Sequence, residues 1–153
     1  MSAAVRRLAL LAAALIAAAC ATTTPPAPSG GAGGLADTRW RLEKFESSDD
    51  AQGVSQPADP SRYSLDFQPD GRLAMQLDCN RGTAQWTATP SEPGRGVLSI
   101  SPGAMTRAMC PPGSWDTRIA QNLSQVQSYV IEGDRLHLAL KLDSGIYTWV
   151  RER

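Results

Sequence analysis

The chain has 153 residues, with 15 basic and 15 acidic side chains and a formal net charge of +0. After residues 1–19 the basic residues are scattered singly, which argues against nucleic acid as a partner, because phosphate binding depends on clustered Lys and Arg. The length and the 42% hydrophobic content suit one compact domain with its own core.

Residues 1–19 have the pattern of an export signal. Arg6-Arg7 precedes an uninterrupted apolar run from Leu8 to Ala19, and Cys20 follows where the hydrophobicity ends. The run is shorter than the ~20 residues that a membrane-spanning helix needs. A cysteine at the cleavage point makes the segment similar to a bacterial lipoprotein signal, which predicts cleavage before Cys20 and lipid attachment to it. Ordinary signal cleavage with an incidental cysteine is the alternative.

A lipid on Cys20 predicts how the rest of the chain is held. Two or more acyl chains anchor a protein stably. Ala21, in place of Asp, matches the bacterial sorting pattern for the outer membrane, with the domain facing the periplasm. Residues 20–34 then form the lipidated cysteine and a Pro/Gly/Thr-rich flexible tether. A folded domain is expected over 35–153.

Most of this domain alternates apolar and polar residues with a period of two, which predicts half-buried strands. The expected elements are a first strand at Trp40–Leu42, a mobile polar loop over 46–61, a hairpin over 62–78 that turns at Gly71, and strands near 83–88 and 96–101.

The period changes between Ser114 and Gln127, where Trp115, Ile119, Leu123 and Val126 form one stripe of an amphipathic helix. Ser114 is the expected N-cap. The alternation then resumes, with one strand running to Leu142 and a last strand carrying Tyr147 and Trp149. The predicted fold class is α+β, mainly antiparallel β, with six to eight strands in a curved sheet or open barrel and one helix.

Cys79 and Cys110 are the two cysteines after Cys20. An exported chain meets an oxidising environment, so we expect them to form a disulfide. Two free thiols and a zinc site are the alternatives. Zinc is disfavoured because the chain has no CxxC motif and only one histidine, His137.

Candidate catalytic residues are few. His137 is expected to be a solvated strand residue, and the aspartates before glycines suit turns. We therefore expect no catalytic activity, no cofactor and no metal. Two interpretations of Asn80 remain open: it locks a turn beside the disulfide, or it joins Arg81, Thr106 and Arg107 in a polar rim that binds a partner. The four tryptophans are expected in the core.

Several motifs together resemble the META domain family, which includes HslJ-like heat-shock lipoproteins. The matching segments are Trp40-Arg41-Leu42, Tyr63–Phe67 with Gly71, Cys79-Asn80 with Trp86, Thr106–Cys110, Asp116, and Tyr129–Leu138. The resemblance covers residues 36–151. Two glycines of the family pattern are replaced, by Asp78 and Ala84.

The resemblance implies a non-enzymatic envelope module linked to stress or antibiotic tolerance. Such a module would bind or shield an envelope protein or another envelope component. A small-ligand-binding or inhibitor-type lipoprotein is the alternative. A sizeable apolar cavity in the domain would favour that alternative.

Overall fold

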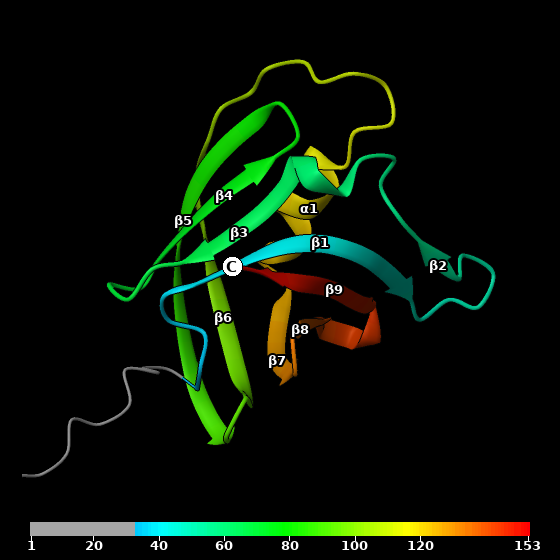
Figure 1. Cartoon of the computed structure of the whole chain (residues 1–153). Coiled ribbons are helices and arrows are strands. Elements are labelled where there is room, and N and C mark those ends of the chain that lie inside the picture. Colours follow the sequence, from blue (N-terminus) through cyan, green and yellow to red (C-terminus); the bar gives the residue numbers. More distant parts are fainter. Residues whose placement is uncertain (1–32) are drawn as a thin grey trace, which may run out of the picture.

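The strands of this protein form a sheet that closes on itself. The computed structural model describes residues 33–153, so the signal, Cys20 and most of the tether lie outside the described residues. Eight antiparallel strands follow the order β1-β3-β4-β5-β6-β7-β8-β9, and β9 pairs with β1 to complete a barrel (Figure 1). The predicted fold class is confirmed, and the barrel is closed rather than open.

The elements have the following bounds: β1 Thr38–Ser47, β2 Val54–Ser55, β3 Tyr63–Phe67, β4 Arg72–Leu77, β5 Asn80–Glu92, β6 Arg95–Met105, α1 Asp116–Leu123, β7 Val126–Glu132, β8 Arg135–Leu140 and β9 Gly145–Glu152. Two short 3₁₀ turns, η1 Pro60–Arg62 and η2 Lys141–Asp143, complete the set. The hairpin over 62–78 appears as β3 and β4, with Gly71 at a φ of 85° in the turn. The polar loop over 46–61 also contains β2 and η1, so it is more ordered than expected.

Two pairs of neighbouring strands in the barrel differ greatly in the length of the ladder that joins them. β1 pairs with β9 along nearly its whole length, from Arg39 opposite Glu152 to Ser47 opposite Gly145. β6 pairs with β7 only between Arg95 and Val97. Beyond Val97 the two strands separate (Figure 1), and α1 packs near β4 on the far side of the gap from β6.

The barrel interior is filled by side chains. Its largest fully buried members are Trp40, Trp149, Tyr129, Tyr147 and Phe67. Trp86 packs edge-on against Phe67 with 5.4 Å between ring centroids. The expectation that tryptophans belong to the core holds for Trp40, Trp86 and Trp149, whereas Trp115 is half-buried beneath the guanidinium of Arg118.

Two local expectations are wrong. The helix is shorter than 114–127 because Val126 already begins β7, and its N-cap is Trp115, although the Ser114 hydroxyl accepts a hydrogen bond from the Asp116 amide at 3.3 Å. Leu142 does not extend a strand: it is 95% exposed and has a φ of 56° in a turn. His137 lies on the outer face of β8, opposite buried Leu136 and Leu138, and stays partly exposed with its Nδ1 3.2 Å from the Thr148 Oγ1. No helix within residues 33–153 is long and apolar enough to cross a membrane.

Candidate binding groove

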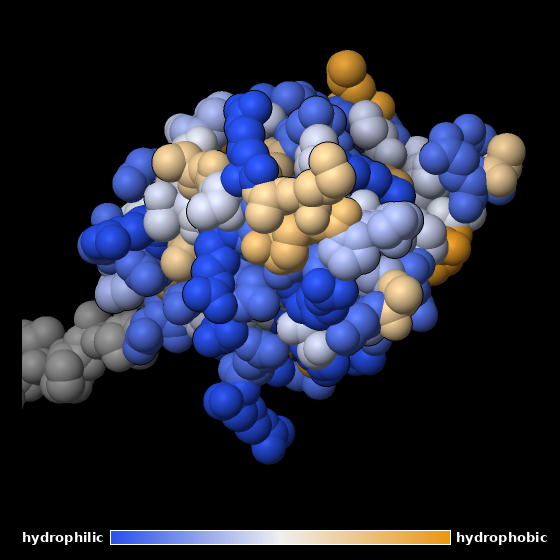
Figure 2. Space-filling view, turned by 90° about the horizontal axis from the view of Figure 1, so that it is seen from above, coloured by the Kyte–Doolittle hydropathy of each residue, from blue (hydrophilic) through white to orange (hydrophobic). Residues whose placement is uncertain are grey.

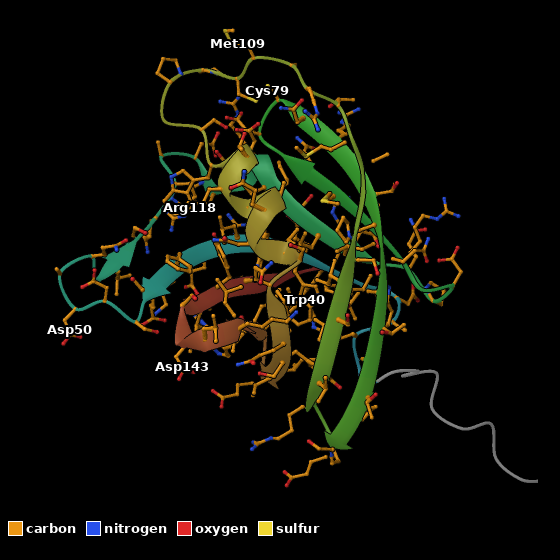
Figure 3. All side chains as sticks on the ribbon, turned by 180° about the vertical axis from the view of Figure 1, so that it is seen from behind. Trp40, Asp50, Cys79, Met109, Arg118 and Asp143 are labelled. Carbon is orange, nitrogen blue, oxygen red and sulfur yellow. A yellow bond between two sulfur atoms is a disulfide. The ribbon has the colours of Figure 1, made fainter. Side chains whose placement is uncertain are left out.

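The disulfide fixes one end of the barrel. Cys79 and Cys110 are bonded, with their Cα atoms 5.5 Å apart, and they join the β4–β5 turn to the segment that leads into α1. Figure 3 shows Cys79 at this end, below the loop that carries Met109. The segment 106–115 therefore crosses the barrel end as a covalently attached strap.

Asp78 explains one departure from the family pattern. It stands where the pattern has glycine, and its φ is 59°. Aspartate tolerates this left-handed conformation better than most residues. Its buried carboxylate also forms an ion pair with Arg62 and lies 3.5 Å from the Tyr63 hydroxyl. The turn therefore keeps its shape without glycine.

Asn80 is the hub of hydrogen bonds at the disulfide end of the barrel, where its side chain connects several segments. Its side chain is 1% exposed and its Oδ1 accepts hydrogen bonds from the Ala108 amide at 2.7 Å and the Thr106 hydroxyl at 2.9 Å. Its Nδ2 donates to the Ala108 carbonyl at 3.0 Å and to Asp116 Oδ2 at 2.9 Å. One amide thus ties the strap and the start of α1 to β5, which supports the turn-locking interpretation.

Asp116 is held as a carboxylate by these contacts. Its partial burial disfavours the charged form, but hydrogen bonds from the Thr117 amide, the Asn80 side chain and Ser114 outweigh burial and lower its pKa. The negative charge also lies in the first turn of α1, where the helix dipole favours it.

A groove of about 640 Å³ opens beside this hub, between β6, the strap and α1. Met75 and Met105 line it from the sheet, Ala120 and Gln121 line it from the helix, and Arg107 and Met109 line it from the strap. Viewed from this end, the surface shows a pale apolar area surrounded by hydrophilic side chains (Figure 2).

The apolar lining of the groove follows from the strand register. Gly82 on β5 pairs with Met75 on one side and with Met105 on the other, so both methionines point to the same face as Gly82. A Cβ at Gly82 would lie 3.2 Å from the Met105 side chain, so the absence of a side chain leaves room for Met105. The sequence alternation places Met75 inward, but only the register brings Met105 beside it.

The structure brings together three of the four predicted rim residues. Asn80, Thr106 and Arg107 line the groove, whereas Arg81 lines an adjoining shallow hollow that shares Thr106 with it. Arg81 contributes through its main chain: its amide donates to the Thr106 hydroxyl and its carbonyl accepts from the Thr106 amide, both at 2.9 Å. The sequence did not predict that α1 forms a wall of the groove, because nothing in it places Ala120 and Gln121 opposite β6.

Two solved structures share this fold at low sequence identity. An NMR structure of a protein from Burkholderia xenovorans is 18% identical, covers 92% of this chain and 99% of its own, and superposes with a TM-score of 0.64. A crystal structure of a DUF4847 family protein from Bacteroides vulgatus is 14% identical, covers 76% of this chain and 93% of its own, and has a TM-score of 0.54. These similarities show the fold alone.

No curated protein sequence matches the chain significantly. The META domain model, in contrast, matches residues 33–151, which is nearly the whole described part. This protein therefore belongs to the META domain family.

Proposed function

We propose that this protein is a non-catalytic binding module of the bacterial envelope, attached to the outer membrane by a lipid on Cys20. Membership of the META domain family indicates an envelope-associated protein. The proposed role is to bind another envelope component during stress or antibiotic exposure. The groove beside Asn80 is the observation that carries this proposal.

The groove has the character of a binding site because its walls are fixed before any ligand arrives. The disulfide and the hydrogen bonds of Asn80 hold the strap, and α1 is fixed by Ile119 and Leu123 in the core. A preformed site loses less conformational entropy on binding than a mobile one. The side chains that line it nevertheless include flexible methionines, which adapt to different apolar groups.

A small-ligand role is the second candidate, and the size of the groove favours it. Small-molecule sites usually enclose about 300–1,000 Å³, a range that includes the groove. The barrel interior is filled by aromatic side chains, so a ligand would bind in the groove rather than inside the barrel.

In vivo crosslinking in the native host tests the proposal. We expect the anchored protein to crosslink reproducibly to one envelope component, and the Cys20→Ala protein to fold normally but to lose its biological effect. A crosslinking group at Gln121 on the groove wall should capture the component, whereas the same group at exposed Gln52 should not. Full biological effect from the unlipidated protein would contradict the role of the anchor. Capture of only a metabolite would favour the small-ligand role.

A further inference from the structure

All the methionines between residues 33 and 153 line the groove beside Asn80. Met75 and Met105 are half-buried on its floor and pack against the core, and Met109 stands at its rim with a fully exposed side chain. Methionine side chains are apolar and unbranched, so they adapt their shape to an apolar group that enters. The volume of about 640 Å³ lies within the range of about 300–1,000 Å³ that is usual for sites that enclose whole small molecules.

Most polar side chains of the lining already have hydrogen-bond partners within the protein. These engaged side chains are Asn80, Thr106, Asp116, Thr117 and Ser124. An apolar group that displaces water from the groove therefore leaves few polar groups without a partner, which keeps the cost of desolvation low. The lining thus favours an occupant with an apolar body.

Two polar side chains of the lining remain available to an occupant. Arg107 on the strap and Gln121 on α1 form no side-chain hydrogen bond or ion pair within residues 33–153, and of the two only Arg107 is charged. The acidic residue of the lining, Asp116, is engaged by Asn80 and Thr117. A carboxylate at the rim would therefore find a guanidinium with its hydrogen-bond donors available.

The groove lies at the end of the barrel remote from Gly33, where the described chain begins. Gly33 and Gly94 line one small hollow at the β5–β6 turn. β6 then runs from Arg95 to Met105, and at about 3.4 Å per residue it separates that turn from the groove by about 30 Å. Figure 1 shows the start of the described chain and the strap at opposite ends of the molecule. With the proposed anchor on Cys20, the groove opens toward the aqueous phase rather than toward the bilayer.

This position indicates the source of the occupant. Two or more acyl chains hold a lipid stably in its bilayer, whereas a single acyl chain binds a membrane only weakly and reversibly. A single-chain amphiphile therefore exchanges through water and can reach a groove that faces away from the membrane.

We propose that the groove binds a free fatty acid of medium chain length. The acyl chain lies over Met75 and Met105, and the carboxylate pairs with Arg107 at the rim. This inference rests on the small-ligand form of the proposed function and names the chemical class of the ligand.

Titration calorimetry of the exported, full-length Cys20→Ala protein tests this inference. The probe is laurate below its micellar concentration, and the control is dodecyltrimethylammonium, which has the same chain length and the opposite charge. We expect laurate to bind about tenfold more tightly, which corresponds to one charge-assisted contact, and Arg107→Gln should remove this difference. Octanoate should bind about tenfold more weakly than laurate or worse, because each buried methylene group contributes a factor of about four.

Two matched variants locate the binding. Gln121→Trp places a large ring on the helical wall of the groove, and Gln85→Trp places the same ring at an exposed position of β5 outside the lining. The affinity for laurate should fall about tenfold or more in the first variant and stay unchanged in the second. In NMR spectra of the protein without these changes, the methyl signals of Met75 and Met105 should shift when laurate is added.

The fatty-acid site would be overturned by equal affinity for the two amphiphiles, by equal binding of laurate to both tryptophan variants, or by unchanged methionine methyl signals. The host crosslinking experiment separates this inference from the proposed function. If the crosslinking group at Gln121 captures an envelope component while laurate does not bind, the binding function stands and the fatty-acid site is wrong. If laurate binds as expected and no component is captured, the fatty-acid site stands and the role in binding another envelope component is wrong.

Discussion

The barrel is closed in different ways at two strand contacts, one between β1 and β9 and one between β6 and β7. The first is a nearly continuous ladder along nine residues of β1, from Arg39 to Ser47, with fully buried Trp40 and Trp149 beneath it. The second stops after three residue pairs, and a helix, a strap and a disulfide replace the missing hydrogen bonds. Backbone pairing closes the barrel at one place, and side chains and a covalent bond hold it at the other.

This difference indicates where a barrel can carry a binding site. A continuous ladder leaves no room between its strands. An interrupted ladder leaves room for a groove, but the neighbouring segments must then be fixed by other means. Here the Cys79–Cys110 bond and Asn80 provide that support. The five predictions below test the two contacts separately.

Trp149→Ala should have the largest effect, because it removes a fully buried indole from the closed contact. We expect a loss of about 3–5 kcal/mol in the free energy of unfolding, measured by urea denaturation. Trp115→Ala is the matched control, since Trp115 is half-buried beside α1, and it should cost less than about 2 kcal/mol. Equal losses would show that the two contacts contribute alike.

Replacing Cys79 and Cys110 together by alanine should loosen the open contact. The disulfide closes a loop between residues 31 positions apart, and its loss should cost about 3–4 kcal/mol in the chain-entropy model. Hydrogen exchange should accelerate first in the 106–115 strap and in α1, while the β1 and β9 amides stay protected. Uniform acceleration across the barrel would contradict the division between the two contacts.

Asn80→Ala should leave the Ala108 amide and carbonyl without their side-chain partner and remove one of the hydrogen bonds to the Asp116 carboxylate. We expect a loss of about 2–3 kcal/mol, since buried polar groups without partners are costly. Asn80→Asp is the informative companion, because it keeps the shape but puts a second carboxylate against Asp116. Its stability should improve when the medium is acidified and one carboxyl is protonated. An unchanged pH profile would rule out direct contact between these side chains.

Removing the hydroxyl should change stability differently at two buried tyrosines. The Tyr147 hydroxyl accepts a hydrogen bond from Asn122 Nδ2 at 2.9 Å, so Tyr147→Phe should cost about 1 kcal/mol. The Tyr129 hydroxyl is buried with no partner within residues 33–153, and burial raises its pKa. Tyr129→Phe should leave stability unchanged or raise it by up to about 1 kcal/mol. Thermal melts of the two variants provide the comparison.

The pH dependence contributed by Asp116 should be the smallest effect. The hydrogen bonds to its carboxylate hold its folded pKa below the ordinary value of an aspartate, so its stabilising contribution is present above the unfolded pKa and is lost as the pH falls through the folded pKa. The urea midpoint of Asp116→Asn should therefore fall less on acidification below about pH 4 than that of the unchanged protein. Asp49, Asp59 and Asp70 also have lowered pKa values, so only the difference between the two proteins is diagnostic.

The sequence predicted the parts of this fold that depend on local pattern. The alternation at Tyr63–Phe67 and the turn at Gly71 specify a hairpin whatever surrounds them. Leu142 shows the limit of this reasoning. It continues the alternation of β8, yet the chain turns there, with Leu142 and Asp143 both at positive φ, so that β9 can pair with β1.

The binding groove was less predictable because it depends on contacts between distant residues. Asn80 was singled out because its place beside Cys79 is visible in the chain, and its hydrogen bonds agree with the turn-locking interpretation. The neighbouring position of Met75 and Met105 depends on two strand registers and on Gly82 between them. Helix α1 reaches its position because Ile119 and Leu123 enter the core. The apolar stripe of the helix predicts this burial, but it does not indicate which strand the helix faces.

The closed contact has a consequence for how the chain folds. β1 is the first strand described and β9 the last, so the barrel cannot close until the C-terminal residues are available. Contacts between such distant segments slow folding. Until β9 arrives, one edge of β1 and the apolar side chains of Trp40, Leu42 and Phe45 lack their final partners, which is the kind of surface that causes aggregation. We therefore expect the newly made chain to be more prone to aggregation than the finished barrel.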